Sequence, residues 1–303
     1  MKKISLILSV FLTVCLLFVS CELVSEKPAK GKLYVVAIGD NFVSQPGFNP
    51  IMSCENDADA LCQVFDYLGK KAGMETVIYN CSAGRFEAFE AALEEVRSKA
   101  TENDLTVIFV STHGSNTIKE TVSYSTETDA KALFYLEKTD GSVMGVYDAG
   151  LKNYCSYING KVLILADFCF SGSLVTQDYF TYNNANFSGA SALSLLFDGT
   201  HATGSNKVFA LSASTYYEYS WANYPLSTFT KYLLMGLGMS NYNPSTKQIT
   251  MSSGIPVANG GRIILSDLYK YVYNHSTSSS LEGSHTQTPQ MNTGANDLIL
   301  FSF

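Results

Sequence analysis

The sequence of 303 residues lacks the marks of several large functional classes. It has 20 basic against 27 acidic residues and no dense Lys/Arg cluster after its first residues, which disfavours nucleic acid as a partner. Only four histidines occur, without a Cys-x-x-Cys pair or a His-Glu-x-x-His motif, so a zinc site is not expected. Serine hydrolase and nucleotide-binding chemistry also lack their usual anchors, because no Gly-x-Ser-x-Gly, Walker or strand-linked Gly-x-Gly-x-x-Gly motif is present.

The N-terminus has the pattern of a bacterial export signal. Lys2 and Lys3 precede a mainly apolar run over residues 4–19, shorter than the roughly 20 residues that span a bilayer. Residues 18–21, Phe-Val-Ser-Cys, resemble a lipobox, although Phe18 stands where Leu is usual. We expect a lipoprotein signal peptide over residues 1–20, a lipid on Cys21 and a tether over 21–32. The chain would then be an exported bacterial lipoprotein, membrane-anchored and facing the periplasm or the cell surface. A plain secretory signal with an incidental Cys21 is the alternative.

An odd number of cysteines remains once Cys15 leaves with the signal and Cys21 carries lipid. The remaining five are Cys54, Cys62, Cys81, Cys155 and Cys169. An unpaired thiol in an exported protein is either a reactive group or a buried apolar side chain, and the count does not decide between them. Any disulfide pairing among the first four therefore stays open.

Apolar runs and helical periodicity alternate along the rest of the chain. Buried strands are predicted at residues 33–39, 76–79, 105–110, 161–166 and 208–212. Helices are predicted at residues 56–68, 86–100, 147–158, 228–237 and 266–273. Asn56 or Asp57 is expected to cap the first helix and Ser266 the last. This alternation predicts one α/β domain over 33–303, a mainly parallel sheet between helices. Residues 115–130 and 173–206 are expected to be long loops, and 275–286 a surface turn.

Two predicted strands end in residues that carry chemistry. His113 and Gly114 follow the strand at 105–110, and Asp167 and Cys169 follow the strand at 161–166. Ligands of open α/β sheets gather outside the carboxyl ends of the strands, so we expect His113 and Cys169 to share one cleft. A cysteine attacks as its thiolate, and a nearby imidazole takes up the proton and later protonates a leaving amine. Each residue alone is also compatible with a structural role, such as a buried core thiol.

With these motifs the sequence resembles the caspase-like cysteine peptidases, and among them the metacaspases. The resemblance rests on Tyr34-Val35-Val36-Ala37-Ile38-Gly39, Cys54-Glu55-Asn56-Asp57-Ala58, His113-Gly114 and Asp167-Phe168-Cys169-Phe170-Ser171-Gly172. Weaker matches follow at residues 211–214, 229–234, 268–272 and 287–290. It implies a caspase-like three-layer sandwich and a cysteine endopeptidase with His113 and Cys169 as its catalytic dyad. Backbone N–H groups of Gly114 and Cys169 would form the oxyanion hole. Thr112 departs from the family, which usually has Gly before the histidine.

The resemblance also implies a specificity for Arg or Lys before the cleaved bond. The metacaspase pocket for a basic side chain is lined by residues that match Cys54, Asp57, Ser111 and Asp167. Two carboxylates in a partly desolvated pocket repel each other and favour a guanidinium, which rejects acidic substrates. Helix capping is an equally plain role for Asp57, and Asp167 would also serve by orienting the turn before Cys169.

Four further expectations concern processing, cofactors and partners. No Lys or Arg lies between Cys169 and Lys207, so an enzyme selective for basic residues is expected to stay uncleaved there. No cofactor or metal is required by the chemistry. Calcium activation is left open, because Glu127, Asp129 and Asp140 lack the spacing of a ligand loop. Peptides or proteins are the expected substrates of a monomer. The alternatives are a silent caspase-like peptide-binding lipoprotein, an adhesin, or an asparagine-directed or gingipain-like peptidase.

Overall fold

A computed structural model describes residues 30–83, 85–116, 132–175, 193–197, 207–279, 286–292, 295 and 298–303. The chain divides into two units, residues 1–30 and 31–303, and every element described below belongs to the second. The predicted signal peptide, Cys21 and most of the tether lie outside the described residues, as do Glu127 and Asp129. Within the described ranges, no helix combines the length and apolar character that a membrane span needs.

A six-stranded sheet with the order β12-β8-β7-β3-β1-β2 lies at the centre of the second unit. Its strands are β1 (Leu33–Gly39), β2 (Thr76–Asn80), β3 (Leu105–Ser111), β7 (Lys161–Asp167), β8 (Val208–Ser212) and β12 (Gln290–Met291). All neighbouring pairs are parallel except β12 with β8. The predicted α/β class with a mainly parallel sheet is therefore confirmed.

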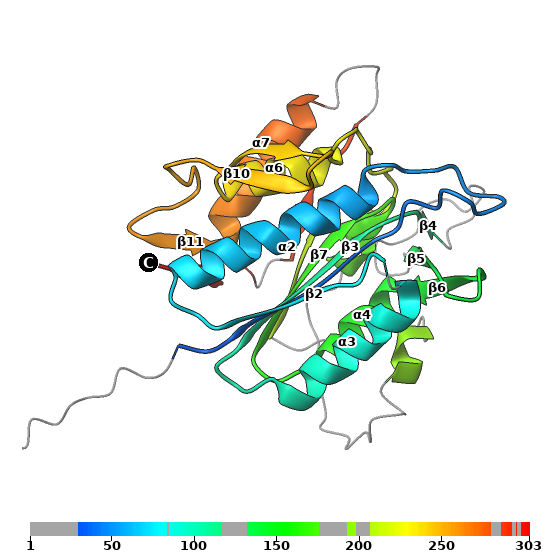
Figure 1. The fold of residues 1–303 in the computed structure, drawn as a ribbon, viewed down its shortest axis with the longest axis horizontal. Coiled ribbons are helices and arrows are strands. Elements are labelled where there is room, and N and C mark those ends of the chain that lie inside the picture. The colour runs from blue at the N-terminus through cyan, green and yellow to red at the C-terminus, as the bar shows by residue number, and fades with distance from the viewer. Residues whose placement is uncertain are drawn as a thin grey trace, which may run out of the picture. The chain divides into compact units, whose positions relative to one another are not determined.

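Helices cover both faces of this sheet (Figure 1). The first face packs against α2 (Cys54–Lys71), α6 (Thr228–Gly236) and α7 (Leu265–Ser279), and the second against α3 (Arg85–Lys99) and α4 (Asp148–Cys155). Side chains of β1 alternate between the two cores: Val35 and Ala37 join the first, Val36 and Ile38 the second. A strand buried on both faces reads as a continuous apolar run, which is why the sequence indicated it.

Smaller antiparallel sheets surround the central one and were not predicted. They comprise β4 (Gly114–Asn116), β5 (Ala132–Glu137) and β6 (Val143–Tyr147); β9 (Met239–Asn243) with β10 (Gln248–Met251); and β11 (Arg262–Ile264) with β13 (Ile299–Ser302). The expected loop at 115–130 thus begins inside β4, while its residues from 117 on lie outside the described part. The 3₁₀ helices η2 (Ser171–Leu174) and η3 (Ser194–Phe197) overlap the expected loop at 173–206. At three residues each, β4 and β11 carry too few residues for a period-two signal.

Three helix boundaries differ from those predicted. Helix α2 begins at Cys54, so Asn56 and Asp57 lie in its first turn and neither caps it. Helix α4 is shorter than the predicted 147–158. Helix α7 begins at Leu265, so Ser266 is not its cap, and it continues to Ser279 through the expected surface turn. Ser276 lies buried in this extension, and its hydroxyl is satisfied by a hydrogen bond of 2.7 Å to the carbonyl of Val272 one turn earlier.

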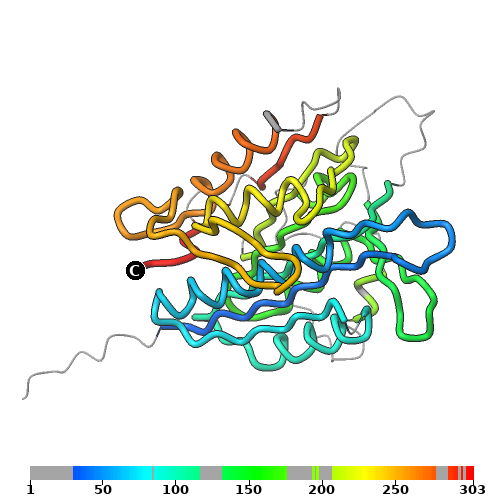
Figure 2. Tube along the Cα trace, turned by 45° about the horizontal axis from the view of Figure 1, so that its top comes forward, coloured from blue at the N-terminus to red at the C-terminus, as the bar shows by residue number. Residues whose placement is uncertain are grey.

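The chain returns to the sheet after α7. Figure 2 shows the red segment that contains β12 running beside the orange helix α7. Gln290 and Met291 pair antiparallel with Ser212 and Leu211 of β8. The C-terminal part of the chain therefore closes the edge of the sheet next to the strand that leads into residues 213–224.

Candidate active site

The ends of β3 and β7 bring the two predicted catalytic segments together. Ser111 lies opposite Asp167 in the register of these parallel strands, and the N–H of Thr112 donates to the carbonyl of Asp167 at 3.3 Å. A methyl group at Gly114 would lie only 2.3 Å from the carbonyl oxygen of Cys169. The turn after His113 therefore contacts the turn that carries Cys169, and only a glycine permits this approach.

The Cys169 thiol is partly exposed at this contact. Burial raises its pKa, while backbone hydrogen bonds from Ser220, Gly114 and Cys169 itself lower it in part. The N–H groups of Gly114 and Cys169 are the two predicted oxyanion donors, and both lie close enough to the sulfur to favour negative charge there. Because the thiol is still a weak acid, it needs a base to become a nucleophile.

The His113 imidazole is oriented by the loop that follows β1. Its Nε2 lies 2.6 Å from the carbonyl oxygen of Asn49, which accepts hydrogen bonds only, so Nε2 carries the proton. In the neutral ring, Nδ1 is then the nitrogen able to accept a proton. The rings of Phe42 and Phe48 pack against the imidazole with centroids 5.2 and 5.3 Å away. The structure thus fixes the tautomer that a general base needs.

Asp57 lies fully buried at the start of α2, under the ends of the strands. It accepts hydrogen bonds from the Ser111 hydroxyl at 2.8 Å, the Ser227 N–H at 2.9 Å and the Ser227 hydroxyl at 2.6 Å. Burial and the nearby charge of Asp167 hold its pKa well above the ordinary range of a carboxyl. Every partner is a neutral donor, so the ionised side chain keeps its full negative charge.

Asp167 repeats this arrangement at the end of β7. It accepts bonds from the N–H and hydroxyl of Thr230 at 3.2 and 2.7 Å and from the Ser220 hydroxyl. Burial also raises its pKa. Cys54 completes the group, since its own pKa is raised by burial and then by the charges of Asp57 and Asp167. The structure therefore gathers the four residues predicted to line the pocket for a basic side chain. No Lys or Arg among the described residues pairs with either carboxylate.

Thr112, the departure from the family pattern, makes a contact with β5. Its side chain is buried, and its hydroxyl donates to the carbonyl of Tyr135 in β5 at 2.6 Å. The branched side chain is therefore used to tie the central sheet to the small sheet.

Residues 213–224, which follow β8, form one side of the site next to Cys169; we call this segment the Ser220 wall. The sulfur lies 3.8 Å from the carbonyl oxygen of Ser220, and the N–H of Phe170 donates to the carbonyl of Glu218 at 2.8 Å. This wall is attached to the C-terminal part of the chain. The N–H of Trp221 donates to the side chain of Gln287, and the N–H and hydroxyl of Thr288 donate to the Glu218 carboxylate.

No role was predicted from the sequence for four residues of the site: Asn49, Ser220, Ser227 and Thr230. The first acts through its backbone carbonyl, which is the same in every residue. The other three are common hydroxyl residues whose partners lie 53, 170 and 63 positions away in the chain. Only the tertiary fold brings them to the carboxylates.

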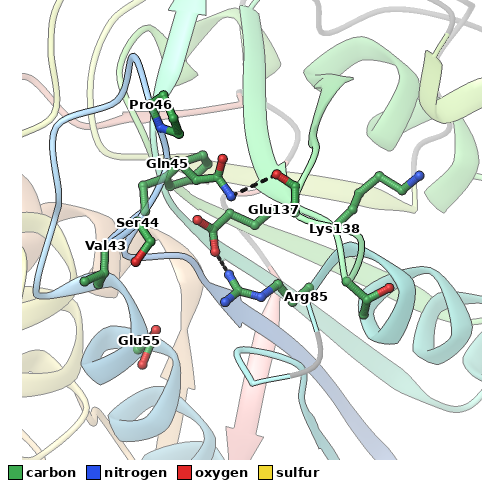
Figure 3. A pocket seen from close by; sticks show the side chains of 11 residues that line it. Val43, Ser44, Gln45, Pro46, Glu55, Arg85, Glu137 and Lys138 are labelled. Carbon is green, nitrogen blue, oxygen red and sulfur yellow. Dashed lines mark hydrogen bonds and ion pairs between the residues drawn. The ribbon is translucent and has the colours of Figure 1, made fainter.

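A charged cluster supports the loop that orients His113. Asp40 is buried after β1, where it accepts the N–H groups of Phe42 at 3.3 Å and of Glu137 at 2.6 Å. Arg85 lies 3.9 Å from Asp40 and forms an ion pair with Glu137. Figure 3 shows this ion pair between the two side chains, at a pocket of about 380 Å³. Asp40 thereby joins β1, β5 and α3 at the corner next to the imidazole.

Asp40 makes the stability of the protein depend on pH. Burial raises its pKa to about 6, against the lowering effects of the Phe42 N–H, Arg85 and His113. Between the ordinary carboxyl pKa of about 4 and this value, the folded state holds a proton that the unfolded chain has released. The stabilisation is therefore complete at low pH and is lost as the pH rises through about 6. We expect the free energy of unfolding of the wild type, relative to Asp40→Asn, to fall by about 2 kcal/mol between pH 4 and 7.

Urea titrations across this pH range measure that difference. Asp66→Asn is the control, because the stability contributed by Asp66 should change with pH in the opposite direction. Burial acts to raise the pKa of Asp66, but hydrogen bonds from Lys70 and Thr76 lower it overall. The stabilisation by the ionised Asp66 side chain is therefore present above the pKa of an unfolded Asp, and it is lost as the pH falls through the lowered pKa of the folded state. A wild-type advantage over Asp40→Asn that stays constant with pH would contradict the assignment.

Metal ligands do not gather in the described part of the chain. No group of three His, Cys, Asp or Glu residues there is placed to hold an ion. Asp140, one of the three carboxylates considered for calcium, is exposed and accepts hydrogen bonds from the N–H and hydroxyl of Ser142. The five cysteines of the described residues are all free thiols, so none of them pairs in a disulfide.

Comparison with known proteins places this geometry in context. The sequence profile of the caspase domain matches residues 33–293. No curated protein matches the chain. Among solved structures, protein GSU0716 from Geobacter sulfurreducens is similar at 14% identity and a TM-score of 0.51, over 86% of this chain and 92% of that one. Caspase-1 from Spodoptera frugiperda matches at 12% identity and a TM-score of 0.47, over 87% and 86% of the two chains.

Proposed function

Because the chain belongs to the caspase-domain family, whose members are cysteine peptidases, we propose that it is a metacaspase-like endopeptidase cleaving after Arg or Lys. The observation that carries this specificity is the pair of buried carboxylates, Asp57 and Asp167, beside the turn of Cys169. Among the described residues no cation of the chain balances them. A guanidinium or ammonium from a substrate would supply the missing charge, and an acidic side chain would be repelled.

The chemistry uses groups that meet at the ends of β3 and β7. His113 accepts the thiol proton at Nδ1, and the Cys169 sulfur attacks the carbonyl carbon of the peptide bond. The N–H groups of Gly114 and Cys169 donate to the oxygen as it becomes negative. The imidazolium then protonates the leaving nitrogen, and the carbon–nitrogen bond breaks. A water molecule, deprotonated by His113, hydrolyses the resulting thioester and restores the thiol.

The setting of this activity is also a proposal. The export pattern of residues 1–20 and the lipobox-like Cys21 support a lipid-anchored monomer that faces the periplasm or the cell surface. Peptides or proteins in that compartment would be its substrates, and no cofactor takes part in the chemistry. Whether calcium increases the rate is a separate question for the assay below.

One substrate panel tests the proposed activity and specificity. Fluorogenic peptides ending in Arg, Lys, Asp or Asn are incubated with the wild type and with Cys169→Ala, with and without calcium. We expect turnover of the Arg and Lys peptides by the wild type only. Hydrolysis of the Asp or Asn peptides instead would contradict the role of the carboxylate pair. If the wild type cleaves none of them, the chain is a peptide-binding lipoprotein or adhesin.

A further inference from the structure

The order of strands in the central sheet gives a direction to a bound substrate. In the sequence β8-β7-β3-β1 of neighbouring strands, the Ser220 wall follows β8, Cys169 follows β7, His113 follows β3 and Phe42 follows β1. The proposed reaction places the attacked carbonyl carbon at Cys169 and the leaving nitrogen at His113. The part of the substrate after the cleaved bond therefore leaves β7 in the direction of β1.

A polar cavity lies in that direction. It has a volume of about 380 Å³ and lies between the loop after β1, the start of α2, the start of α3 and the end of β5. Phe42 belongs both to its lining and to the aromatic contact with the imidazole, whose ring centroid is 5.2 Å away. The cavity thus shares a wall with the group that releases the leaving amine.

The charges of this cavity leave one carboxylate unbalanced. Arg85 forms an ion pair with Glu137 and also lies 3.9 Å from Asp40. Lys138, which also lines the cavity, lies 3.7 Å from Asp140. Both cations are therefore already partnered by carboxylates, Arg85 by two of them.

Glu55 is the remaining charge. It comes from α2, across the cavity from the ion pair of Arg85 and Glu137 (Figure 3). Its side chain forms no ion pair with any described residue. Its backbone N–H is held independently by the side chain of Asn41 at 3.1 Å. The lining itself carries two acidic and two basic side chains, and the excess of negative charge around it comes from Asp40 and Asp140, which lie behind Arg85 and Lys138.

We propose that this cavity is a subsite for a Lys or Arg side chain on the leaving side of the cleaved bond, with the Glu55 carboxylate as its partner. The inference rests on the proposed peptidase function and adds a second basic residue to the substrate. It concerns the first two positions after the cleaved bond, because the cavity begins at Phe42, directly beside the imidazole.

Peptides that share Arg before the cleaved bond and carry Lys, Ala or Glu in the first or second position after it test the proposal. We expect kcat/KM for Lys to exceed that for Ala by about fivefold at one of these positions, the effect of one partly exposed ion pair. Glu is expected to be cleaved more slowly than Ala. Glu55→Gln should abolish the preference for Lys. Glu102→Gln, an exposed position before the amino end of β3 and therefore far from the strand ends that carry the site, should keep it.

An Arg aminocoumarin amide has no residue after the cleaved bond and separates the two proposals. We expect the wild type and Glu55→Gln to hydrolyse it equally. Hydrolysis of the coumarin substrate without a Lys preference among the peptides overturns the subsite alone. A wild type inactive on both overturns the peptidase and the subsite together. An equal loss on all substrates in Glu55→Gln would show that Glu55 only supports the fold, which also overturns the subsite.

Discussion

Replacing His113 by Ala is expected to lower kcat on Arg substrates by at least about a thousandfold at neutral pH. The reason lies in the environment of the nucleophile. Burial raises the pKa of the Cys169 thiol, so little thiolate exists unless a base takes the proton. Cys169→Ala should lose at least as much, and the double variant should be no worse than either single one, because the two residues act as a unit.

The pH profile distinguishes a missing base from a damaged fold. The residual activity of His113→Ala should rise with pH, since hydroxide then forms the thiolate that the imidazole no longer generates. The rate of thiol alkylation should follow the same profile. His275→Ala serves as the control, because His275 stacks on Tyr271 in α7, away from the ends of β3 and β7. Activity of His113→Ala within tenfold of the wild type would remove the imidazole from the mechanism.

Replacing Asp57 by Asn is expected to lower kcat/KM on Arg substrates by about a hundredfold, mainly through KM. The substitution keeps the size of the side chain and removes one of the two buried carboxylates that we propose bind the substrate cation. The pKa of Asp57 is raised by burial, so its ionised form costs the folded protein free energy at neutral pH. The variant should therefore keep its thermal stability while losing affinity for the substrate.

Asp66→Asn provides the matched control on the same helix. Asp66 pairs with Lys70 at the solvent-facing side of α2 and should leave kcat/KM unchanged. Equal losses of activity and melting temperature in Asp57→Asn would show that the hydrogen bonds to Ser111 and Ser227 matter only for folding. Unchanged KM with Arg substrates would exclude Asp57 from the pocket.

The sequence predicted the central architecture because its strands are buried on both faces. Continuous apolar runs marked β1, β3, β7 and β8, and their carboxyl ends pointed to Ser111, His113, Asp167 and Cys169. Once strands run parallel, residues that follow neighbouring strands must meet at one edge. That rule was sufficient to bring the His113 and Cys169 segments together.

The surroundings of the site could not be read in the same way. The loop carbonyl of Asn49 and the hydroxyls of Ser220, Ser227 and Thr230 depend on long-range packing and have no periodic pattern. Asp57 looked equally suited to a helix cap, and the boundary of α2 alone excluded that role. Local propensity also failed at α7, which continues through a polar segment in which Ser276 is buried.

The Ser220 wall is held in place by Gln287 and Thr288, which come near the C-terminus of the chain. A chain that ends before these residues contains both His113 and Cys169 but lacks the Thr288 donors to Glu218 and the Gln287 oxygen that accepts the Trp221 N–H. The side of the cleft next to the sulfur is then unsupported, and β8 has an open edge where β12 should pair. The proposed peptidase activity would therefore depend on residues 287–291 as well as on the segments that carry His113 and Cys169.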